Sequence, residues 1–365
     1  MQKKKILIVV GTRPNFIKVT QFKKEALKYK NLILKIVHTG QHYDQTMSGV
    51  FFKQFNLEPD YYLNADNSSV ISQMSSIMSK LETLIINEYK PDLIIVPGDV
   101  NSTLASALVA NKLSIKLAHL ESGLRSYDKD MPEEHNRILT DHLSDYLFVT
   151  EQSGLNNISK EGLNGKPFFV GNTMIDSVFH FSDEIDNSPI LKNLNLKNDY
   201  ILMTMHRPSN VDNIIGIKKI VNLLVELSKK QTVVFPIHPR TLNKIKQFDL
   251  FHKIKNDRII ITSAMGYFEF QHLIYKSKLI ITDSGGIQEE STYRQKPCLT
   301  LRENTERPST ITIGSNELIG FNTEEILIQI NKIENNTFKK GEIPKFWDGF
   351  ATQRILEIIN TEILN

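Results

Sequence analysis

The sequence has a single cysteine, Cys298, and a single tryptophan among its 365 residues. One cysteine excludes an intramolecular disulfide and any metal site that needs several thiolates. A long apolar run is missing as well, because Ile6–Val10 is too short for a signal sequence or a membrane span. We therefore expect a soluble protein in a reducing compartment, with the cytoplasm as the default.

An excess of charge of one sign is also missing. Lys and Arg number 44 against 41 Asp and Glu, which gives a net charge of +3 and a pI of about 8.6. This mild balance does not indicate a nucleic acid or a membrane as partner, but it suits an anionic small molecule. Neither G-x-G-x-x-G nor a Walker P-loop occurs, so these two phosphate-binding signatures are not available.

The chain does contain a repeated alternation of strand-like and helix-like segments. Its length suffices for two domains, and its 40% hydrophobic and 23% charged residues are typical of a globular protein. Such alternation predicts parallel sheets with helices on both faces. It stops at the polar stretch Ser182–Asp199 and then restarts, so we expect two α/β halves joined near residue 170.

The expected strands are Ile6–Val10, Leu32–His38, Leu93–Val96, Ile115–Leu120, Tyr146–Thr150 and Phe168–Asn172 in the first half, and Tyr200–Met205, Thr232–Pro236, Arg258–Thr262, Leu279–Thr282 and Pro297–Leu301 in the second. Helices are expected from Arg13 towards Tyr29 and over Ser68–Tyr89, Ile214–Lys229 and Phe350–Ile363.

Carboxylates follow the ends of two successive expected strands. Asp99 comes after Leu93–Val96, Glu121 comes after Ile115–Leu120, and Glu133 lies in the next loop. Ligands of open α/β sheets bind beyond the carboxyl ends of the strands, so these groups suggest proton-transfer chemistry. The alternative is that they are strand-end caps and a surface acidic loop.

Two other strand ends have the character of anion sites. In Gly11-Thr12-Arg13-Pro14 a strand turns into a helix, and Arg13 and Lys18 add positive charge. In the Thr282–Glu290 stretch, Ser284, Gly285 and Gly286 could hold a diphosphate, and Glu290 could accept from two ribose hydroxyls. The alternatives are a plain turn with surface cations, and a Gly-Gly turn whose acidic residues offset the helix dipole.

Basic and aromatic residues follow further strand ends of the second half. His206, Arg207, His238 and Arg307 look like a phosphate clamp when taken together, although a lone histidine is more often structural. Tyr267 and Phe270 could stack on a base, and core packing is the other use of at least one aromatic residue there.

In order along the chain, these motifs resemble the non-hydrolysing UDP-N-acetylglucosamine 2-epimerases. The resemblance rests on Gly11–Pro14, Pro97-Gly98-Asp99, Glu121-Ser122-Gly123-Leu124-Arg125, Pro132-Glu133-Glu134, Asn136-Arg137, His206-Arg207, Ser284–Glu290 and Glu306-Arg307-Pro308. It implies a GT-B fold, in which two Rossmann-like doubly wound domains enclose the active site in the cleft between them. The implied domains are residues 1–169 with a returning C-terminal helix 351–365, and a UDP-binding domain of residues 170–350.

The same resemblance implies the reaction and its residues. Such enzymes interconvert UDP-GlcNAc and UDP-ManNAc by eliminating UDP to 2-acetamidoglucal and adding it back, with no nicotinamide cofactor and no metal. Asp99, Glu121 and Glu133 would do the acid–base work, and His206 would assist the leaving phosphate. The groups implied to hold UDP and the sugar are Arg13, Lys18, Arg137, Arg207, His238, Tyr267, Phe270, Ser284, Gly285, Gly286, Glu290 and Arg307. A homodimer and a role in making a surface polysaccharide are implied as well.

Two departures from the family pattern leave the sugar open. Met131 stands where relatives often carry Trp before Pro-Glu-Glu, and Gln41-His42-Tyr43-Asp44 differs from the Gln-His-Arg of allosterically regulated members. A modified UDP-HexNAc, either a diacetamido-uronic acid or a 6-deoxy sugar, is therefore an alternative substrate. A GT-B glycosyltransferase is the other alternative, since fold alone does not decide function.

Overall fold

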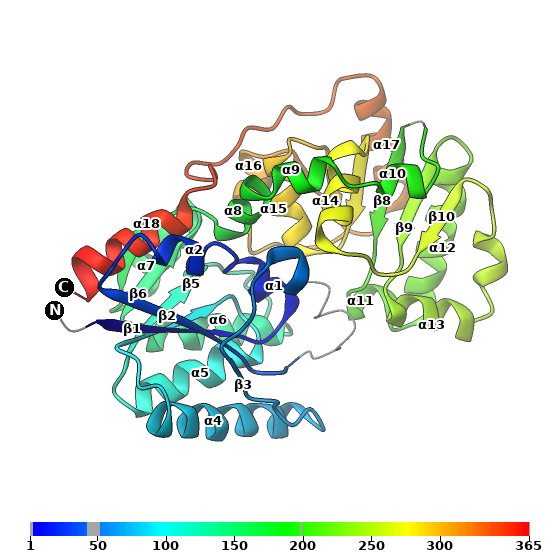
Figure 1. The fold of residues 1–365 in the computed structure, drawn as a ribbon. Helices are drawn as coiled ribbons and strands as arrows, with labels where there is room; N and C mark the ends of the chain where they lie inside the picture. The colour runs from blue at the N-terminus through cyan, green and yellow to red at the C-terminus, as the bar shows by residue number, and fades with distance from the viewer. Residues whose placement is uncertain (1–2, 42–51, 198, 365) are drawn as a thin grey trace. The chain divides into compact units, whose positions relative to one another are not determined.

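The computed structural model describes residues 3–41, 52–197 and 199–364, which form two compact units (Figure 1). The first unit comprises Met1–His180 and Lys345–Asn365, and the second comprises Phe181–Pro344. The chain thus leaves the first unit after residue 180 rather than near 170, because α8 (Thr173–His180) packs there. Ser177 of α8 donates to the carbonyl of Ile17 at 2.5 Å and shares a 2.6 Å hydrogen bond with Thr20.

Parallel pairing throughout one seven-stranded sheet organises the first unit. Its strand order is β3-β2-β1-β4-β5-β6-β7. The strands are β1 (Lys4–Val10), β2 (Leu32–His38), β3 (Tyr61–Tyr62), β4 (Leu93–Pro97), β5 (Lys116–Leu120), β6 (Tyr146–Val149) and β7 (Lys166–Phe169). The central strands are continuous apolar runs because helices cover both faces of a parallel sheet.

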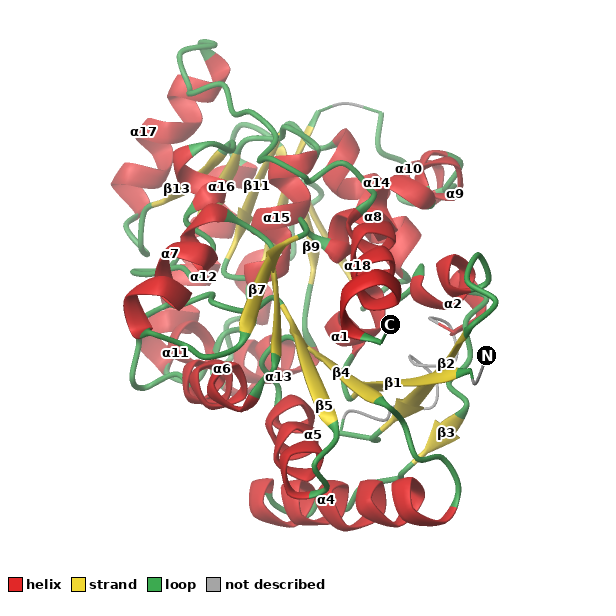
Figure 2. Cartoon of the chain, turned by 90° about the vertical axis from the view of Figure 1, so that its left-hand side faces the viewer, coloured by secondary structure: helices red, strands yellow, loops and turns green. Residues whose placement is uncertain are grey.

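Helices cover both faces of this sheet, as Figure 2 shows, with α4 and α5 on one side and α1, α2, α8 and α18 on the other. They are α1 (Arg13–Ile17), α2 (Phe22–Ala26), α4 (Val70–Asn87), α5 (Asn101–Lys112), α6 (Pro132–Leu143), α7 (Gln152–Glu161), α8 and α18 (Ala351–Ile358). Under α4, Ile77 and Leu81 pack with Leu7 and Val9 of β1 in one apolar cluster.

The C-terminal segment returns to the first unit. Trp347 is buried and donates its indole N–H to the carbonyl of Thr150 at 3.0 Å. Helix α18 packs on α2 and α8, and a π-helical turn over Ile359–Ile363 follows it. Lys116 then donates to the carbonyl of Ile363 at 2.8 Å.

The second unit has a six-stranded parallel sheet with the order β10-β9-β8-β11-β12-β13. The strands are β8 (Tyr200–Thr204), β9 (Thr232–Pro236), β10 (Ile259–Thr262), β11 (Leu279–Thr282), β12 (Cys298–Thr300) and β13 (Asn316–Leu318). The helices are α9 (Ser182–Asp186), α10 (Ile190–Asn193), α11 (Pro208–Val211), α12 (Ile214–Ser228), α13 (Pro239–Gln247), the 3₁₀ turn Phe251–Ile254, α14 (Tyr267–Lys276), α15 (Gly285–Tyr293), α16 (Ser309–Thr312) and α17 (Thr323–Glu334).

Two apolar clusters sandwich this sheet. One joins the strands to α12, α13 and α17, and the other joins them to α10, α14 and α15. Both units therefore have the Rossmann-like doubly wound architecture that the alternation predicts. In each sheet the strand order reverses at the point where the first strand of that unit, β1 or β8, meets the fourth, β4 or β11. Ligands of such sheets bind at this switch point.

Three local predictions differ from the structure. The helix expected from Arg13 towards Tyr29 is broken into α1 and α2, and the strand expected over Phe168–Asn172 ends at Phe169. The stretch Ser182–Asp199 contains α9 and α10, whose apolar residues Ile185 and Ile190 are buried although the composition is polar. Of Gln41–Asp44, residues 42–44 lie outside the described residues. No helix within the described ranges is both long and apolar enough to cross a membrane.

Candidate active site

Glu121 forms a buried ion pair directly after β5. Its Oε2 lies 2.5 Å from Nζ of Lys18, and the two side chains are 3% and 4% exposed. The backbone of Glu121 has a φ of +72°, a left-handed conformation that costs a residue with a side chain roughly 1–3 kcal/mol. The other oxygen, Oε1, is buried and has no hydrogen-bond partner in the described part of the chain. A strained carboxylate with an unused acceptor is suited to take a proton.

The turn after β4 closes over this pair. Gly98 has a φ of +66°, and a Cβ there would lie 3.0 Å from Nζ of Lys18 and 3.2 Å from Nδ2 of Asn15. Asn15 in turn donates to the carbonyl of Pro97 at 3.0 Å and accepts from the backbone of Gly11 at 3.3 Å. The Gly11–Lys18 stretch thus joins the ends of β1, β4 and β5. Helix α1 has only five residues, so the positive charge comes from Arg13 and Lys18 rather than from a helix dipole.

Asp99 is held by Arg137. The guanidinium reaches Oδ2 of Asp99 through Nη2 at 2.7 Å and through Nε at 3.0 Å. Arg137 is only 4% exposed and also pairs with Glu134. Asn136 donates to the backbone carbonyl of Asp99 at 2.8 Å. Asp99 is therefore oriented on both its side chain and its main chain by one face of α6.

Glu133 and Glu134 differ in their surroundings although they are adjacent on α6. Glu134 is buried and accepts from the backbone N–H groups of Ser126 and Tyr127 at 2.9 and 2.8 Å. Glu133 is exposed, and its carboxylate makes no hydrogen bond or ion pair to any residue that the structure describes. Glu134 therefore shapes the preceding loop, while the carboxylate of Glu133 is open to solvent.

In the second unit, a buried aspartate orients His206. Asp283 follows β11 and lies 3.1 Å from Nδ1 of His206. It also accepts from the backbone N–H of Arg207 at 2.9 Å and from Nδ2 of Asn210 at 3.0 Å. Burial by itself raises the pKa of Asp283, but the hydrogen bonds from His206, Asn210 and Arg207 bring it below its usual range. The carboxylate is thus ionised, and His206 presents Nε2 away from it.

His238 lies beside His206, with ring centroids 6.1 Å apart. It is the N-cap of α13, and its Nδ1 accepts from the backbone N–H of Arg240 at 3.2 Å. Partial burial and the neighbouring His206 and Arg240 lower the pKa of His238. A neutral ring that accepts at Nδ1 carries its proton on Nε2, so His238 is a donor.

The N-terminus of α15 carries the predicted diphosphate residues. Ser284 is its N-cap without using its hydroxyl as a cap, and Gly285 begins the helix. A Cβ on Gly285 would lie 2.8 Å from Nη1 of Arg307 and 2.9 Å from Oε1 of Glu306. Arg307 is buried, lies 2.8 Å from Glu289 through Nε, and pairs with Glu306. Glycine at 285 is therefore what lets the helix end approach a buried cation.

The remaining predicted residues lie on α15 and α14. Glu290 is buried on α15 next to Glu289, and Gly286 is half-buried. Tyr267 is buried at the start of α14, and Phe270 packs against an apolar cluster of the second unit. Packing is therefore at least part of the role of Phe270.

Four buried groups that the sequence reasoning missed support these residues. They are Asp283, Glu134, His119 and Asp141. Only Asp283 could have been recognised from the sequence, since it stands at a strand end directly before Ser284. The others lie inside expected elements or beside a stronger candidate, where spacing does not reveal which side chain turns inwards.

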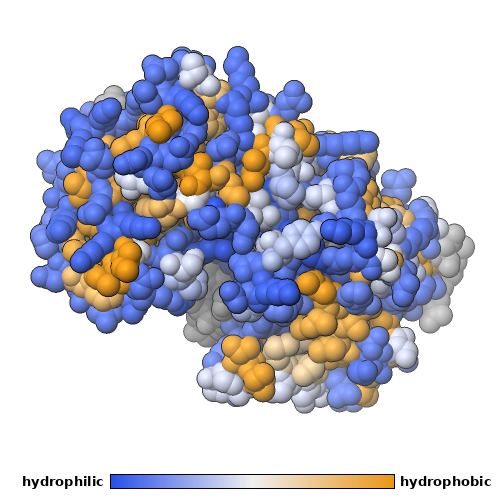
Figure 3. Space-filling view, turned by 180° about the vertical axis from the view of Figure 1, so that it is seen from behind, coloured by the Kyte–Doolittle hydropathy of each residue, from blue (hydrophilic) through white to orange (hydrophobic). Residues whose placement is uncertain are grey.

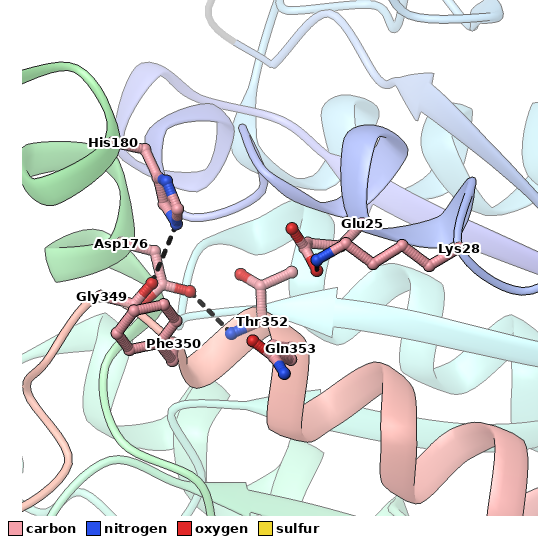
Figure 4. A pocket seen from close by; sticks show the side chains of 8 residues that line it. All are labelled: Glu25, Lys28, Asp176, His180, Gly349, Phe350, Thr352 and Gln353. Carbon is pink, nitrogen blue, oxygen red and sulfur yellow. Dashed lines mark hydrogen bonds and ion pairs between the residues drawn. The ribbon is translucent and has the colours of Figure 1, made fainter.

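A polar pocket of about 90 Å³ lies in the first unit, where α18 docks (Figure 4). It contains none of the predicted site residues. Asp176 accepts from the backbone N–H groups of Ala351 and Thr352 at 3.1 and 2.6 Å, and His180 contacts the carbonyl of Gly349 at 3.0 Å. The pocket groups thus hold the start of α18. Among the described residues, this pocket included, no three His, Cys, Asp or Glu side chains gather so as to hold a metal ion.

Comparison with known proteins gives consistent matches over the whole length. A family model described as UDP-N-acetylglucosamine 2-epimerase matches residues 24–360. The UDP-N-acetylglucosamine 2-epimerase of Methanocaldococcus jannaschii is 40% identical over 364 residues, covering 97% of this chain and 98% of the relative. The UDP-2,3-diacetamido-2,3-dideoxy-D-glucuronate 2-epimerase of Pseudomonas aeruginosa is 37% identical over 361 residues, covering 97% and 99%. The crystal structure of the Methanocaldococcus jannaschii UDP-GlcNAc 2-epimerase in complex with UDP-GlcNAc and UDP superimposes with a TM-score of 0.88 at 41% identity, covering 98% of this chain and 99% of that one.

Proposed function

Because the chain belongs to the UDP-N-acetylglucosamine 2-epimerase family, we propose that it interconverts UDP-GlcNAc and UDP-ManNAc without hydrolysing them. The fold is of the GT-B type, with two Rossmann-like units. The observation that carries the proposal is the buried Lys18–Glu121 pair with its unpartnered oxygen. A protein that only bound UDP-sugar would gain nothing from a carboxylate held in a strained conformation.

Carboxylates of the first unit would move the proton. The hydrogen on C2 of the sugar is not acidic, so simple deprotonation is impractical. In the proposed elimination the C2–H and C1–O bonds break, a C1–C2 double bond forms, and UDP leaves with the electron pair of the C1–O bond. Addition of UDP back to C1 and of a proton to the opposite face of C2 gives the other epimer. Glu121, Asp99 and Glu133 are the proposed acid–base groups, and their assignment to the two faces of C2 is open.

Cations and hydrogen-bond donors of the second unit would hold the leaving group. His206, oriented by Asp283, presents Nε2 to a phosphate oxygen, and His238 offers a second donor. Arg307 beside Gly285 and the first N–H groups of α15 would bind the diphosphate. Arg13, Arg207 and the carboxylate of Glu290 complete the proposed UDP contacts. Such fixed donors stabilise the charge of a departing diphosphate.

A modified UDP-HexNAc is the second candidate substrate. The Pseudomonas aeruginosa relative acts on a diacetamido-glucuronate by its name, and its identity to this chain is close to that of the Methanocaldococcus jannaschii enzyme. Met131 is buried, and its sulfur lies 3.7 Å from Nη2 of Arg137, the arginine that holds Asp99. A flexible thioether at this position differs in shape from Trp, so the sugar specificity has to be measured.

We also propose a homodimer that works in the cytoplasm on the synthesis of a surface polysaccharide. Figure 3 shows apolar residues gathered on the lower part of the first unit. Exposed apolar side chains of its helices include Val70, Ile71 and Ile86 of α4 and Leu139 of α6. Sedimentation analysis that found a monomer at micromolar concentration would contradict the dimer.

The experiment that tests the activity is proton NMR of the purified protein with UDP-GlcNAc in D2O, without added metal or nicotinamide. UDP-ManNAc with deuterium at C2 and little free ManNAc is the expected result. Free ManNAc with UDP would instead indicate hydrolysis. Without turnover of UDP-GlcNAc, the same assay with the diacetamido-uronic and 6-deoxy sugars decides between the epimerase substrates, and UDP release that needs a sugar acceptor would indicate a glycosyltransferase.

A further inference from the structure

Both ring nitrogens of His119 face hydrogen-bond acceptors. The residue lies on β5 and is fully buried. Its Nε2 is 2.7 Å from the carbonyl oxygen of Gly98, and its Nδ1 is 2.7 Å from Oδ1 of Asp141. A carbonyl oxygen can only accept, so Nε2 must carry a proton. The state of the ring is then decided by whether Nδ1 or Asp141 carries the proton between them.

The surroundings of Asp141 favour the ionised carboxylate. Its Oδ2 accepts from the backbone N–H of Gly123 at 3.0 Å and from Nη1 of Arg125 at 2.6 Å. Arg125 also forms a two-pronged pair with Glu161, at 2.9 and 2.6 Å. Two carboxylates and one guanidinium leave one negative charge, which an imidazolium at His119 balances inside the protein.

The same network joins the two turns that carry Asp99 and Glu121. The carbonyl that His119 contacts belongs to the peptide bond between Gly98 and Asp99. Gly123, whose N–H donates to Asp141, is two residues after Glu121. Both turns are in left-handed conformations, with φ of +66° at Gly98, +72° at Glu121 and +77° at Gly123. Of these residues only Glu121 is strained, because glycine adopts a left-handed conformation without a side-chain clash, and a strained conformation persists only where its surroundings hold it.

We propose that His119 is an imidazolium locked by Asp141 and acts as a positioning residue that fixes the turns carrying Asp99 and Glu121. It touches no substrate, and its effect on the reaction rests on the proposed epimerase function. The charged ring holds the Gly98 carbonyl more firmly than a neutral donor, and Asp141 secures the Glu121 turn at the same time. A small displacement of reacting groups costs on the order of 10²-fold in rate.

The protonation state is tested on the full chain labelled with ¹⁵N-histidine. We expect both ring nitrogens of His119 to carry a proton, because each faces a hydrogen-bond acceptor. The signals are assigned by their absence in His119→Gln. A signal from an unprotonated ring nitrogen of His119 would overturn the proposal, whether or not the protein turns over UDP-GlcNAc.

The positioning role is tested by two substitutions at His119. His119→Gln keeps one N–H that can reach the Gly98 carbonyl, whereas His119→Leu has none. We expect His119→Leu to lower kcat on the order of 10²-fold with KM and UDP affinity within about threefold, and His119→Gln to recover part of the loss. The matched control is His272→Leu, since His272 is also buried and contacts one backbone carbonyl, that of Ile185, at 2.7 Å. We expect His272→Leu to lose stability with kcat unchanged.

The outcomes separate positioning from folding and from the activity itself. A folded His119→Leu protein with the wild-type kcat would overturn the positioning role. Equal losses in kcat and in UDP affinity would do the same, because they would indicate general misfolding. If His119→Leu does not fold, the positioning role is tested with Asp141→Asn. The new amide can still accept from Arg125, but it leaves His119 uncharged. The proposal then requires a lower kcat at unchanged UDP affinity. An inactive wild-type chain with a doubly protonated His119 would refute the proposed function and leave the imidazolium standing.

Discussion

Glu121 is the residue on which the proposed chemistry depends most. It is buried with Lys18 and has an unused carboxylate oxygen. Glu121→Gln keeps the shape and the acceptor but removes the base. We expect epimerisation to fall by at least about 10³-fold, because general base catalysis contributes 10²–10⁴-fold. UDP affinity, measured by calorimetry, should stay within about threefold. Equal losses of rate and UDP affinity would make Glu121 a structural residue.

Asp283 acts at the same scale, through His206. It is fully buried and accepts from His206, Arg207 and Asn210. Asp283→Asn places an amide near these donors, so His206 should lose its fixed orientation. We expect kcat to fall by on the order of 10²-fold. Asp212→Asn is the matched control, because Asp212 is exposed and, among the described residues, forms an ion pair with the exposed Arg240 alone. Similar losses in both variants would argue against an orienting role.

At the scale of elements, the N-terminus of α15 depends on close approach to Arg307. In Gly285→Ala the new Cβ would lie 2.8 Å from Nη1 of Arg307, so the guanidinium has to move. We expect UDP affinity to fall by roughly tenfold, since a hydrogen bond to a charged group contributes about 1.5–3 kcal/mol. Gly162→Ala at the end of α7 is the control. A Cβ at position 162 would have no atom within 4 Å, but the φ of +63° is unfavourable for alanine. Gly162→Ala should therefore lower the stability of the protein without changing its UDP affinity.

The docking of α18 on the first unit predicts a pH dependence. Asp176 accepts from the first N–H groups of α18, and burial raises its pKa from 3.8 to about 6. A raised folded-state pKa stabilises the fold below the unfolded value, and this contribution is lost as pH rises through about 6. Relative to Asp176→Asn, the wild-type free energy of unfolding should therefore fall between pH 4 and pH 7, by on the order of 2–3 kcal/mol.

This dependence is measured by urea unfolding followed through Trp347, the single tryptophan, which is buried in the first unit. The control is Asp348→Asn. Burial raises the pKa of Asp348, but its pairing with Arg354 outweighs this and lowers it from its usual value. The charge of Asp348 is the smallest of the causes that shift the pKa of Asp176, so the difference between wild type and Asp348→Asn should vary with pH much less than the difference between wild type and Asp176→Asn. A parallel response of both variants would contradict the assignment to Asp176.

At the scale of the whole molecule, the proposed diphosphate site lies within a continuous unit. Phe181–Pro344 contains its own sheet, two apolar clusters, and the residues His206, Gly285 and Arg307. We expect a fragment of residues 181–344 to fold and to bind UDP, weakened by roughly 10- to 100-fold because Arg13 is missing. Circular dichroism and calorimetry measure the two properties. The same fragment with Arg307→Ala is the control, and a folded fragment without UDP affinity would contradict the prediction.

The two units differ in the number of chain segments that form them, which is two for the first and one for the second. The first unit needs both Met1–His180 and Lys345–Asn365, since Trp347 and α18 complete its packing. A chain ending at Pro344 would lack the N–H groups of Ala351 and Thr352 that donate to Asp176. It would also lack the Trp347 indole that donates to the carbonyl of Thr150. Periodicity predicts the α-helix over Phe350–Ile363 but gives no information on which unit covers its apolar face, so its return to the first unit was implied by the family resemblance alone.

The amino-acid sequence by itself determined most strands and the class of the fold. Leu32–His38, Thr232–Pro236 and Leu279–Thr282 coincide with β2, β9 and β11, because short apolar runs closed by polar residues are typical of buried parallel strands. It also placed charged groups directly after strand ends, and the family follows from these motifs. Such features depend on neighbours a few residues apart, so they can be derived before the chain is folded.

Only the tertiary structure decided which of these groups meet. Lys18 and Glu121 pair across 103 positions, and Asp283 reaches His206 across 77, because strand order brings the ends of distant strands together. The left-handed conformation of Glu121 and the buried His119–Asp141 contact follow from the same packing. Asp99, Glu121 and Glu133 look alike in the sequence. In the folded chain, Asp99 is half-buried and pairs with Arg137, Glu121 is buried and pairs with Lys18, and Glu133 is exposed. These differences arise because burial and interaction partners are properties of the fold rather than of the residue type.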